Sequence, residues 1–191
     1  MRKQLSTAIN HVPPAVRYRM RNAIATARWV AIEAGHKLFT RRESYNAAFW
    51  DAYGTGDWMG LAQTLLRYCP VQSIVDVGCG DGRLLEALGA SRPLHLSGLD
   101  GSRAALTRAE ARGLPVSYSN LAVWNRPAVA DLSRRIAGFD LAVSLETAEH
   151  LPFWCAGGFV RALAEAPAVI FSAAHPNQLG TLHMNEQPFS Y

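Results

Sequence analysis

Three glycines at alternate positions, Gly78, Gly80 and Gly82, separate two apolar segments of the chain. Residues 73–77 form a short apolar run that is typical of a buried strand, and residues 83–88 resume with helical spacing. A strand, a tight glycine turn and a helix N-terminus bring bare backbone close to a nucleotide-like ligand. The third glycine comes one residue earlier than in the G-x-G-x-x-G turn of dinucleotide-binding proteins, so the spacing argues against a dinucleotide.

The acidic-x-G-x-G-x-G pattern that begins at Asp76 resembles the first motif of the class I S-adenosylmethionine (SAM) dependent methyltransferases. The resemblance extends over about residues 73–172 and implies a Rossmann-like fold with SAM as the cofactor. The positions that the resemblance assigns to cofactor binding are Asp76, Gly78, Cys79, Gly80, Gly82, Asp100, Gly101, Asn120, Leu121 and Glu146.

Two of these carboxylates have alternative roles. Asp76 can face the ammonium and sulfonium charges of SAM, or it can order the glycine turn by accepting backbone N–H groups. Asp100 ends an apolar run, residues 94–99, where it can accept hydrogen bonds from both vicinal hydroxyls of a ribose. The alternative for Asp100 is a cap of the helix that begins near Ser102. Because NAD also contains ribose, Asp100 alone does not distinguish it from SAM.

Asn120 and Leu121 follow the third expected strand, residues 115–119. In the family, a short polar residue at this place bonds the adenine amino group and the next, apolar residue packs on the ring. The resemblance therefore implies that Asn120 and Leu121 contact adenine, whereas turn formation by Asn120 is the alternative.

Glu146, Glu149 and His150 follow the fourth apolar run at spacing i, i+3 and i+4, so they would share one face of a helical turn. A similar E-x-x-E-H segment in quinone-pathway O-methyltransferases resembles a divalent-cation site. The resemblance implies that these three residues hold a cation such as Mg²⁺, which lowers the pKa of a phenol or catechol. His150, with Glu149, can instead remove the acceptor's proton as a general base. Packing of His150 against Trp154 is the alternative without chemistry.

The polar segment after the fifth apolar run supplies candidates on the acceptor side. Its His-x-Asn-Glu-Gln sequence resembles that of a subgroup of bacterial methyltransferases. This resemblance implies that His175, His183 and Glu186 line the acceptor pocket. A solvated loop is the alternative.

Alternating strands and helices must position these side chains. We expect strands over 73–77, 94–99, 115–119, 139–145 and 167–172, and helices over 82–89, 102–112, 127–137 and 155–165. This alternation predicts an α/β, Rossmann-like fold with a doubly wound, mostly parallel sheet between two layers of helices. The candidate side chains fall at the carboxyl ends of the strands, where such sheets bind ligands.

Class I sheets usually add an antiparallel pair of strands beside the fifth, and no counterpart of that pair precedes Tyr191. We therefore expect the sheet to lack its last two strands and the fifth strand to be an exposed edge. A partner chain or the remainder of a longer gene product would cover that edge.

The positive charge is concentrated near the N-terminus. The first fifty residues carry nine Lys or Arg against two acids (+7), and the remainder carries ten against thirteen (−3). We expect a basic helical extension over 1–44, with its helix near 15–38, before a SAM-binding domain over 45–191. The helix can lie in solvent or contact an anionic membrane or RNA. The mildly acidic remainder argues against a domain that coats nucleic acid generally. The aromatic residues that follow can cover SAM or pack in the core: Tyr45, Trp50 and Trp58.

The cysteines Cys69, Cys79 and Cys155 have neither paired nor metal-like spacing, which predicts reduced thiols and a cytoplasmic protein. No run approaches the roughly 18 apolar residues of a membrane span.

These features predict a methyltransferase that modifies an oxygen or nitrogen of a small-molecule, lipid or sugar acceptor. The Asn-Pro-Pro-Tyr type segment of base-modifying enzymes is absent after the fourth strand, which disfavours a nucleic-acid acceptor. Two other functions stay open. A non-catalytic SAM-binding or scaffold fragment is favoured by the missing strands, and an NAD-dependent oxidoreductase is opposed by the glycine spacing.

Overall fold

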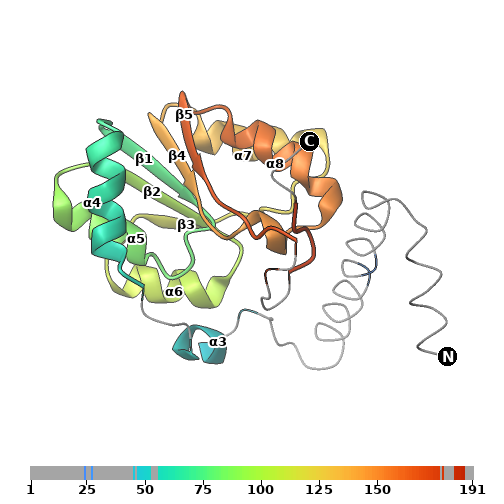
Figure 1. The fold of residues 1–191 in the computed structure, drawn as a ribbon, viewed down its shortest axis with the longest axis horizontal. Coiled ribbons are helices and arrows are strands. Elements are labelled where there is room, and N and C mark those ends of the chain that lie inside the picture. The colour runs from blue at the N-terminus through green and yellow to red at the C-terminus, as the bar shows by residue number, and fades with distance from the viewer. Residues whose placement is uncertain are drawn as a thin grey trace.

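The computed structural model describes Ile24, Ala27, Tyr45 and residues 47–52, 56–176, 178 and 183–187. Five strands of this part form one sheet in the order β3-β2-β1-β4-β5, and every pair is parallel (Figure 1). The strands are β1 (Ser73–Val77), β2 (His95–Asp100), β3 (Val116–Tyr118), β4 (Leu141–Ser144) and β5 (Ala168–Phe171). The predicted doubly wound sheet is confirmed, and its order reverses between β1 and β4.

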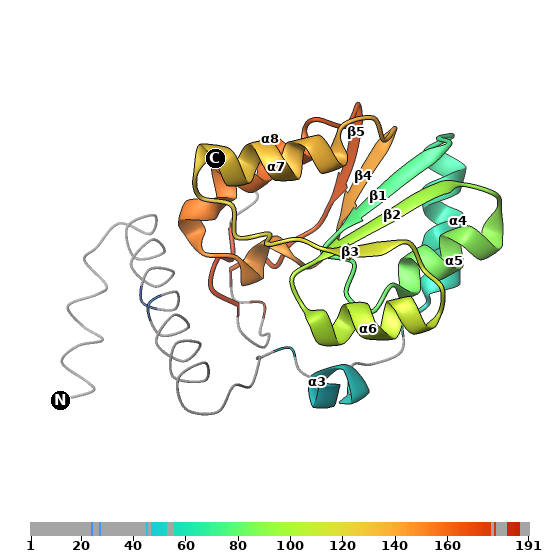
Figure 2. The ribbon, with the colours of Figure 1, turned by 180° about the vertical axis from the view of Figure 1, so that it is seen from behind.

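Helices cover both faces of the sheet (Figures 1 and 2). They are α3 (Ala47–Ala52), α4 (Trp58–Tyr68), α5 (Arg83–Ser91), α6 (Arg103–Ala111), α7 (Arg126–Ile136) and α8 (Ala156–Leu163), with 3₁₀ turns η2 (Ala148–His150) and η3 (Phe153–Cys155). Helices α4 and α5 pack on one face and α7 and α8 on the other. The alternating side chains of the fully buried β1 therefore serve two cores, with Ile74 in the first and Val75 and Val77 in the second.

Local signals set the helix starts. The Ser102 hydroxyl accepts a hydrogen bond from the Ala105 N–H at the start of α6, and the Asn125 side chain accepts one from Ala128 at the start of α7. Pro127 lies in the first turn of α7, where its missing N–H costs no hydrogen bond.

The fourth strand begins later than predicted, because the side chain of Asp140 hydrogen-bonds the backbone at the start of β1. Its Oδ2 accepts the backbone N–H groups of Gln72 and Ser73 at 2.8 and 2.9 Å. The chain therefore enters the ladder only at Leu141.

The expected helix near 15–38 lies outside the described residues, apart from Ile24 and Ala27, which are helical. The membrane contact of this helix and the end of the basic extension at residue 44 stay predictions. Among the described helices, none has the length and apolar character that a membrane crossing requires.

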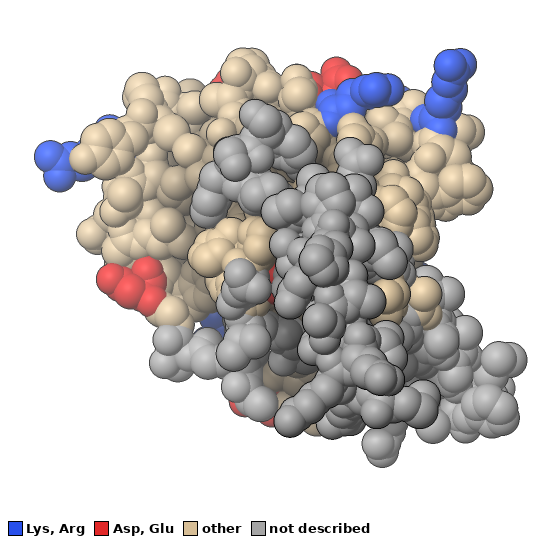
Figure 3. Space-filling model, turned by 45° about the vertical axis from the view of Figure 1, so that its right-hand side comes forward, with Lys and Arg blue, Asp and Glu red and all other residues tan. Residues whose placement is uncertain are grey.

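Strand β5 pairs with β4 and, within the described residues, with no second strand. Val169 and Phe171 on it are 38 % and 47 % exposed, as expected for an edge. Coverage by a partner chain stays a prediction. On the face shown in Figure 3, most of the visible described basic side chains lie at the margins.

Candidate functional site

A cavity of about 870 Å³ opens at the carboxyl ends of the central strands. The segments that follow β1, β2, β3 and β4 all contribute to its wall, as do residues before β1, several of them aromatic, and Ser172 after β5. Tyr45, Trp50 and Trp58 all line it, which favours the covering role over simple core packing. This is the place that the strand order predicts for a ligand.

The first two glycines of the turn face the cavity with bare backbone. Gly78 has φ +91°, and a Cβ there would lie 2.1 Å from the Thr147 Oγ1. Gly80 has φ +54°, and a Cβ there would lie 2.8 Å from the Trp50 ring. Both the left-handed backbone and the close neighbours therefore require glycine.

The third glycine has a different role. Gly82 does not line the cavity; it begins α5 with φ +81°, and an added Cβ would stand 2.6 Å from Leu114 Cδ1. The position of Gly82 lets α5 start and α6 pack closely, and its expected contact with the cofactor stays a prediction.

An ion-pair cluster that the sequence did not indicate braces the turn. Asp81 is 4 % exposed, and its Oδ2 lies 3.0 Å from Arg83 Nε and 3.3 Å from an Arg112 Nη. The Arg112 guanidinium also donates to the Asp81 carbonyl and pairs with Glu86 at 3.1 Å. Arg112 follows α6, so the cluster ties the glycine turn to that helix.

Asp100 holds the turn from the other side. Its Oδ2 accepts the Gly80 N–H at 2.8 Å and its Oδ1 accepts the Ser102 N–H at 2.6 Å. Ser102, and not Asp100, is the residue that caps α6. Burial raises the pKa of Asp100, although the amides of Ser102, Gly80 and Gly101 act in the opposite direction. A carboxylate has about four acceptor positions, so Asp100 keeps acceptor capacity for a ligand.

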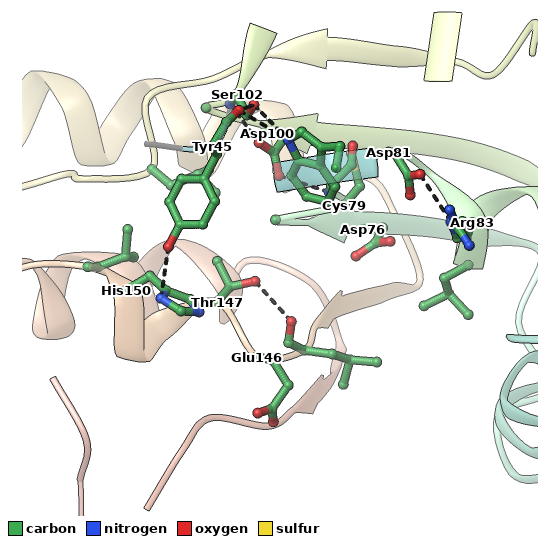
Figure 4. Close-up of a pocket in the computed structure, with 18 of the residues that line it drawn as sticks. Tyr45, Asp76, Cys79, Asp81, Arg83, Asp100, Ser102, Glu146, Thr147 and His150 are labelled. Atoms are coloured by element: carbon green, nitrogen blue, oxygen red, sulfur yellow. Dashed lines mark hydrogen bonds and ion pairs between the residues drawn. The ribbon is translucent and has the colours of Figure 1, made fainter. Parts of the chain in front are cut away.

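Asp76 also lines the cavity and is 4 % exposed. It makes no hydrogen bond within the part of the chain that the structure describes, so it does not order the turn by accepting N–H groups. Burial, and to a smaller extent the charge of Asp100, raise the pKa of Asp76 to about 7. Figure 4 shows Asp76 beside the turn, and a cationic ligand group there would favour its ionised form.

The remaining cofactor candidates are Cys79, Gly101, Asn120 and Leu121. Gly101, Asn120 and Leu121 line the cavity, although the Asn120 Oδ1 also accepts the Ala122 N–H at 3.1 Å, so the turn that the sequence left open is formed. Cys79 also lines it, and its side chain packs with apolar residues of α5 and α6.

Glu146 lines the cavity but does not share a helical face with Glu149 and His150, which corrects the sequence expectation. Its φ is +51°, and the 3₁₀ turn begins only at Ala148. The Ser172 hydroxyl donates to Glu146 Oε1 at 2.8 Å, and in Figure 4 the Glu146 carboxylate points away from Asp76.

A different trio comes together instead. Ligand atoms of Glu149, His150 and His183 lie within 4.8 Å of one another. The Glu149 carbonyl accepts the N–H groups of Met184 and Asn185 at 2.8 and 3.0 Å, which brings the preceding His183 ring to 5.0 Å from that of His150. His183 therefore takes the place that the sequence assigned to Glu146.

Glu149 is fully buried, and neither carboxylate oxygen has a hydrogen-bond partner among the described residues. Burial is the main reason that the pKa of Glu149 rises to about 7, and the nearby charge of Glu146 adds to it. A buried carboxylate without donors is costly unless a cation or a proton neutralises it.

The acceptor-side candidates separate. His183 joins the trio, and its Nδ1 lies 3.4 Å from the Glu186 carboxylate. His175 is exposed, does not line the cavity and has its Nδ1 3.1 Å from the Pro176 carbonyl. The expected contact of His175 with the acceptor stays a prediction. His150 packs edge-on against Tyr45 and His183, and not against Trp154.

Known proteins resemble this chain over the same region. Residues 75–169, about half of the chain, match the sequence model of a methyltransferase domain. The chain is 34 % identical over 84 residues to a ubiquinone biosynthesis O-methyltransferase of Hahella chejuensis (strain KCTC 2396). That match covers 44 % of this chain and 34 % of the relative, so the chain spans about a third of that protein's length.

Solved structures share the fold. The N-terminal domain of EvdMO1, solved in the presence of SAH and D-fucose, gives a TM-score of 0.52 at 17 % identity over 68 % of this chain and 57 % of that chain. The methyltransferase domain of bacterial CtHen1-C gives 0.50 at 23 % identity over 68 % of this chain and 74 % of that chain. Fold, glycine turn and domain match agree, and the chain belongs to the class I S-adenosylmethionine-dependent methyltransferases.

Proposed function

We propose that this chain binds SAM in the cavity and transfers its methyl group to an oxygen of a small-molecule acceptor. The observation that carries the proposal is the meeting of Asp76, Asp100 and bare glycine backbone in one cavity. The O-methyltransferase relative supports oxygen rather than nitrogen as the accepting atom.

The cofactor side follows from the acceptors and donors that the wall presents. The acceptor capacity that Asp100 retains suits the hydroxyls of a ribose. Asn120 and Leu121 would meet the adenine, and Asp76 would face the cationic amino-acid end beside Gly78 and Gly80. The bound cofactor supplies a methyl group already activated by its sulfonium, so positioning and exclusion of water are the main tasks of the chain.

On the acceptor side, His150 lines the cavity together with the apolar Leu145, Leu151 and Pro152. An acceptor hydroxyl must lose its proton during methylation. A neutral imidazole titrates in the range that a general base at neutral pH requires. We therefore assign proton removal to His150, with apolar neighbours that suit a small organic acceptor.

The trio Glu149, His150 and His183 also fits a divalent cation. The fit rests on the unpartnered buried carboxylate of Glu149 and on the spacing of the three ligand atoms. One carboxylate and two imidazoles suit a transition-metal ion better than Mg²⁺, which prefers oxygen ligands. When bound, such an ion would act as a Lewis acid on the acceptor oxygen.

The proposal is tested by isothermal titration calorimetry of the purified chain with S-adenosylhomocysteine (SAH) and with NADH. We expect binding of SAH and none of NADH. Asp100→Asn should weaken SAH binding, whereas Asp131→Asn, an exposed acid on α7 that pairs with Arg134, serves as the matched control. Absence of SAH binding by folded wild-type protein would refute the proposal.

Activity is then tested with methyl-labelled SAM against catechols, phenols, sugars and lipids bearing a free hydroxyl. Label transfer to one of these classes identifies the acceptor. SAH binding without transfer to any of them would favour a non-catalytic SAM-binding protein.

A further inference from the structure

The segment before β1 is fastened to the cofactor side of the cavity. We call Tyr45 and α3 the strap; Tyr45, Phe49 and Trp50 from it line the cavity. The Trp50 indole N–H lies within hydrogen-bond distance of both the Tyr45 carbonyl (3.1 Å) and the Ser102 hydroxyl (3.2 Å). The Ser102 hydroxyl in turn donates to the Tyr45 carbonyl at 2.8 Å. The backbone of Tyr45 is thereby held at the N-terminus of α6, two residues beyond Asp100.

The side chain of Tyr45 reaches the acceptor side. Its hydroxyl oxygen lies 2.9 Å from Nδ1 of His150, which is 105 residues away in sequence, and the two rings meet edge to face. Figure 4 shows Tyr45 spanning the cavity from Ser102 to His150. Tyr45 therefore connects Ser102, two residues after Asp100, with His150 on the acceptor side of the cavity.

This contact bears on which nitrogen of His150 can act. A neutral imidazole carries one N–H, and the hydrogen bond made by one ring nitrogen decides where the lone pair lies. A proton on Nδ1 that is donated to the Tyr45 oxygen leaves the lone pair on Nε2. Either role proposed for His150, general base or cation ligand, needs a lone pair held in a fixed direction.

We propose that Tyr45 is the positioning residue of His150: its hydroxyl accepts the Nδ1–H bond, fixes the ring and places the lone pair on Nε2. Because Trp50 and Ser102 hold the Tyr45 backbone, His150 is set only when the strap lies against the cofactor cavity. Cofactor enclosure and acceptor activation are thus coupled through one side chain. The inference rests on the proposed function and deepens it.

The test is Tyr45→Phe in the full chain, which removes one oxygen and keeps the ring. Nitrogen-15 NMR of labelled histidine reports the tautomer of each of the six His, and a His150→Asn variant assigns the His150 signals. We expect Nδ1 to be protonated in the wild type and a mixture of tautomers in Tyr45→Phe. Because the ring is kept, the affinity for SAH should change less than the turnover number, which should fall about tenfold. Tyr68→Phe, at a 73 % exposed position outside the cavity, is the matched control.

A His150 spectrum that is unchanged in Tyr45→Phe would overturn the inference. Trp50→Phe tests the coupling separately, because it removes the indole N–H that bonds the Tyr45 carbonyl and the Ser102 hydroxyl and leaves His150 itself unchanged. It should weaken SAH binding and also mix the His150 tautomers; a wild-type His150 spectrum in that variant would refute the coupling. Wild-type protein that binds no SAH would instead count against the proposed function.

Discussion

The protonation of Asp76 makes SAM binding depend on pH in a calculable way. Burial and the nearby Asp100 raise the pKa of Asp76 to about 7 in the ligand-free protein. A cationic ligand at this carboxylate favours its ionised form. Below pH 7 the carboxyl must therefore release a proton when SAM binds, and the affinity must fall as the pH falls.

The size of the effect follows from that pKa. With a pKa of about 7, the ionised fraction is roughly 0.76 at pH 7.5 and roughly 0.09 at pH 6.0. The affinity for SAM should therefore fall about eightfold, or roughly 1.2 kcal/mol, between these two values. At pH 6.0 about 0.9 proton should leave for each SAM bound.

Calorimetry in two buffers of different ionisation enthalpy measures both quantities. Asp76→Asn keeps the shape of the side chain and removes its charge. It should bind SAM more weakly at pH 7.5 and lose the eightfold pH dependence, whereas any titration of the amino group of SAM persists in both proteins. Equal proton release by wild type and Asp76→Asn at pH 6.0 would refute the assignment of Asp76.

The same acid should make the ligand-free protein less stable at high pH. Because the folded pKa lies above the unfolded value, the stabilising contribution is complete below about pH 4 and is lost as the pH rises to 7. At pH 7.5 Asp76→Asn should exceed the wild type in unfolding free energy by an amount on the order of 4 kcal/mol, as measured with urea.

Three further variants separate the parts of the site. Gly82→Ala should lower the unfolding free energy by about 2 kcal/mol, because of the φ of +81° at this position and the contact with Leu114. The folded variant should still bind SAH with the wild-type affinity. Impaired binding would mean that Gly82 contacts the cofactor. Gly80→Ala should displace Trp50 and weaken SAH binding by about tenfold or more, and calorimetry showing wild-type affinity would contradict the close contact seen at that turn. Glu149→Gln should abolish the rise in melting temperature that Mn²⁺ or Co²⁺ produces in the wild type. Without metal, the variant should melt at a higher temperature than the wild type at pH 8, because the buried wild-type carboxyl is ionised there. If neither ion raises the wild-type melting temperature, the cation site is disproved.

Local sequence determined the sheet and the cofactor half of the cavity. Apolar runs of strand length alternate with helical spacing, and each predicted strand overlaps an observed one. Because parallel strands end at a common edge, the residues at the carboxyl ends of β1 and β2 had to meet there, and Asp76, Gly80 and Asp100 do so. These outcomes depend on periodicity and on neighbours along the chain, which a single sequence displays.

Tertiary structure alone decided the acceptor half. His183 stands beside His150 because two backbone N–H groups, 35 and 36 positions further along the chain, bond the Glu149 carbonyl. Tyr45 contacts the same histidine across 105 positions. The left-handed φ of Glu146 keeps this residue off the helical turn that holds Glu149 and His150. Sequence spacing predicted a helical face there, because i, i+3 and i+4 residues meet only if the backbone is helical throughout. Contacts between distant segments depend on how loops cross the sheet edge, and no local pattern encodes that path.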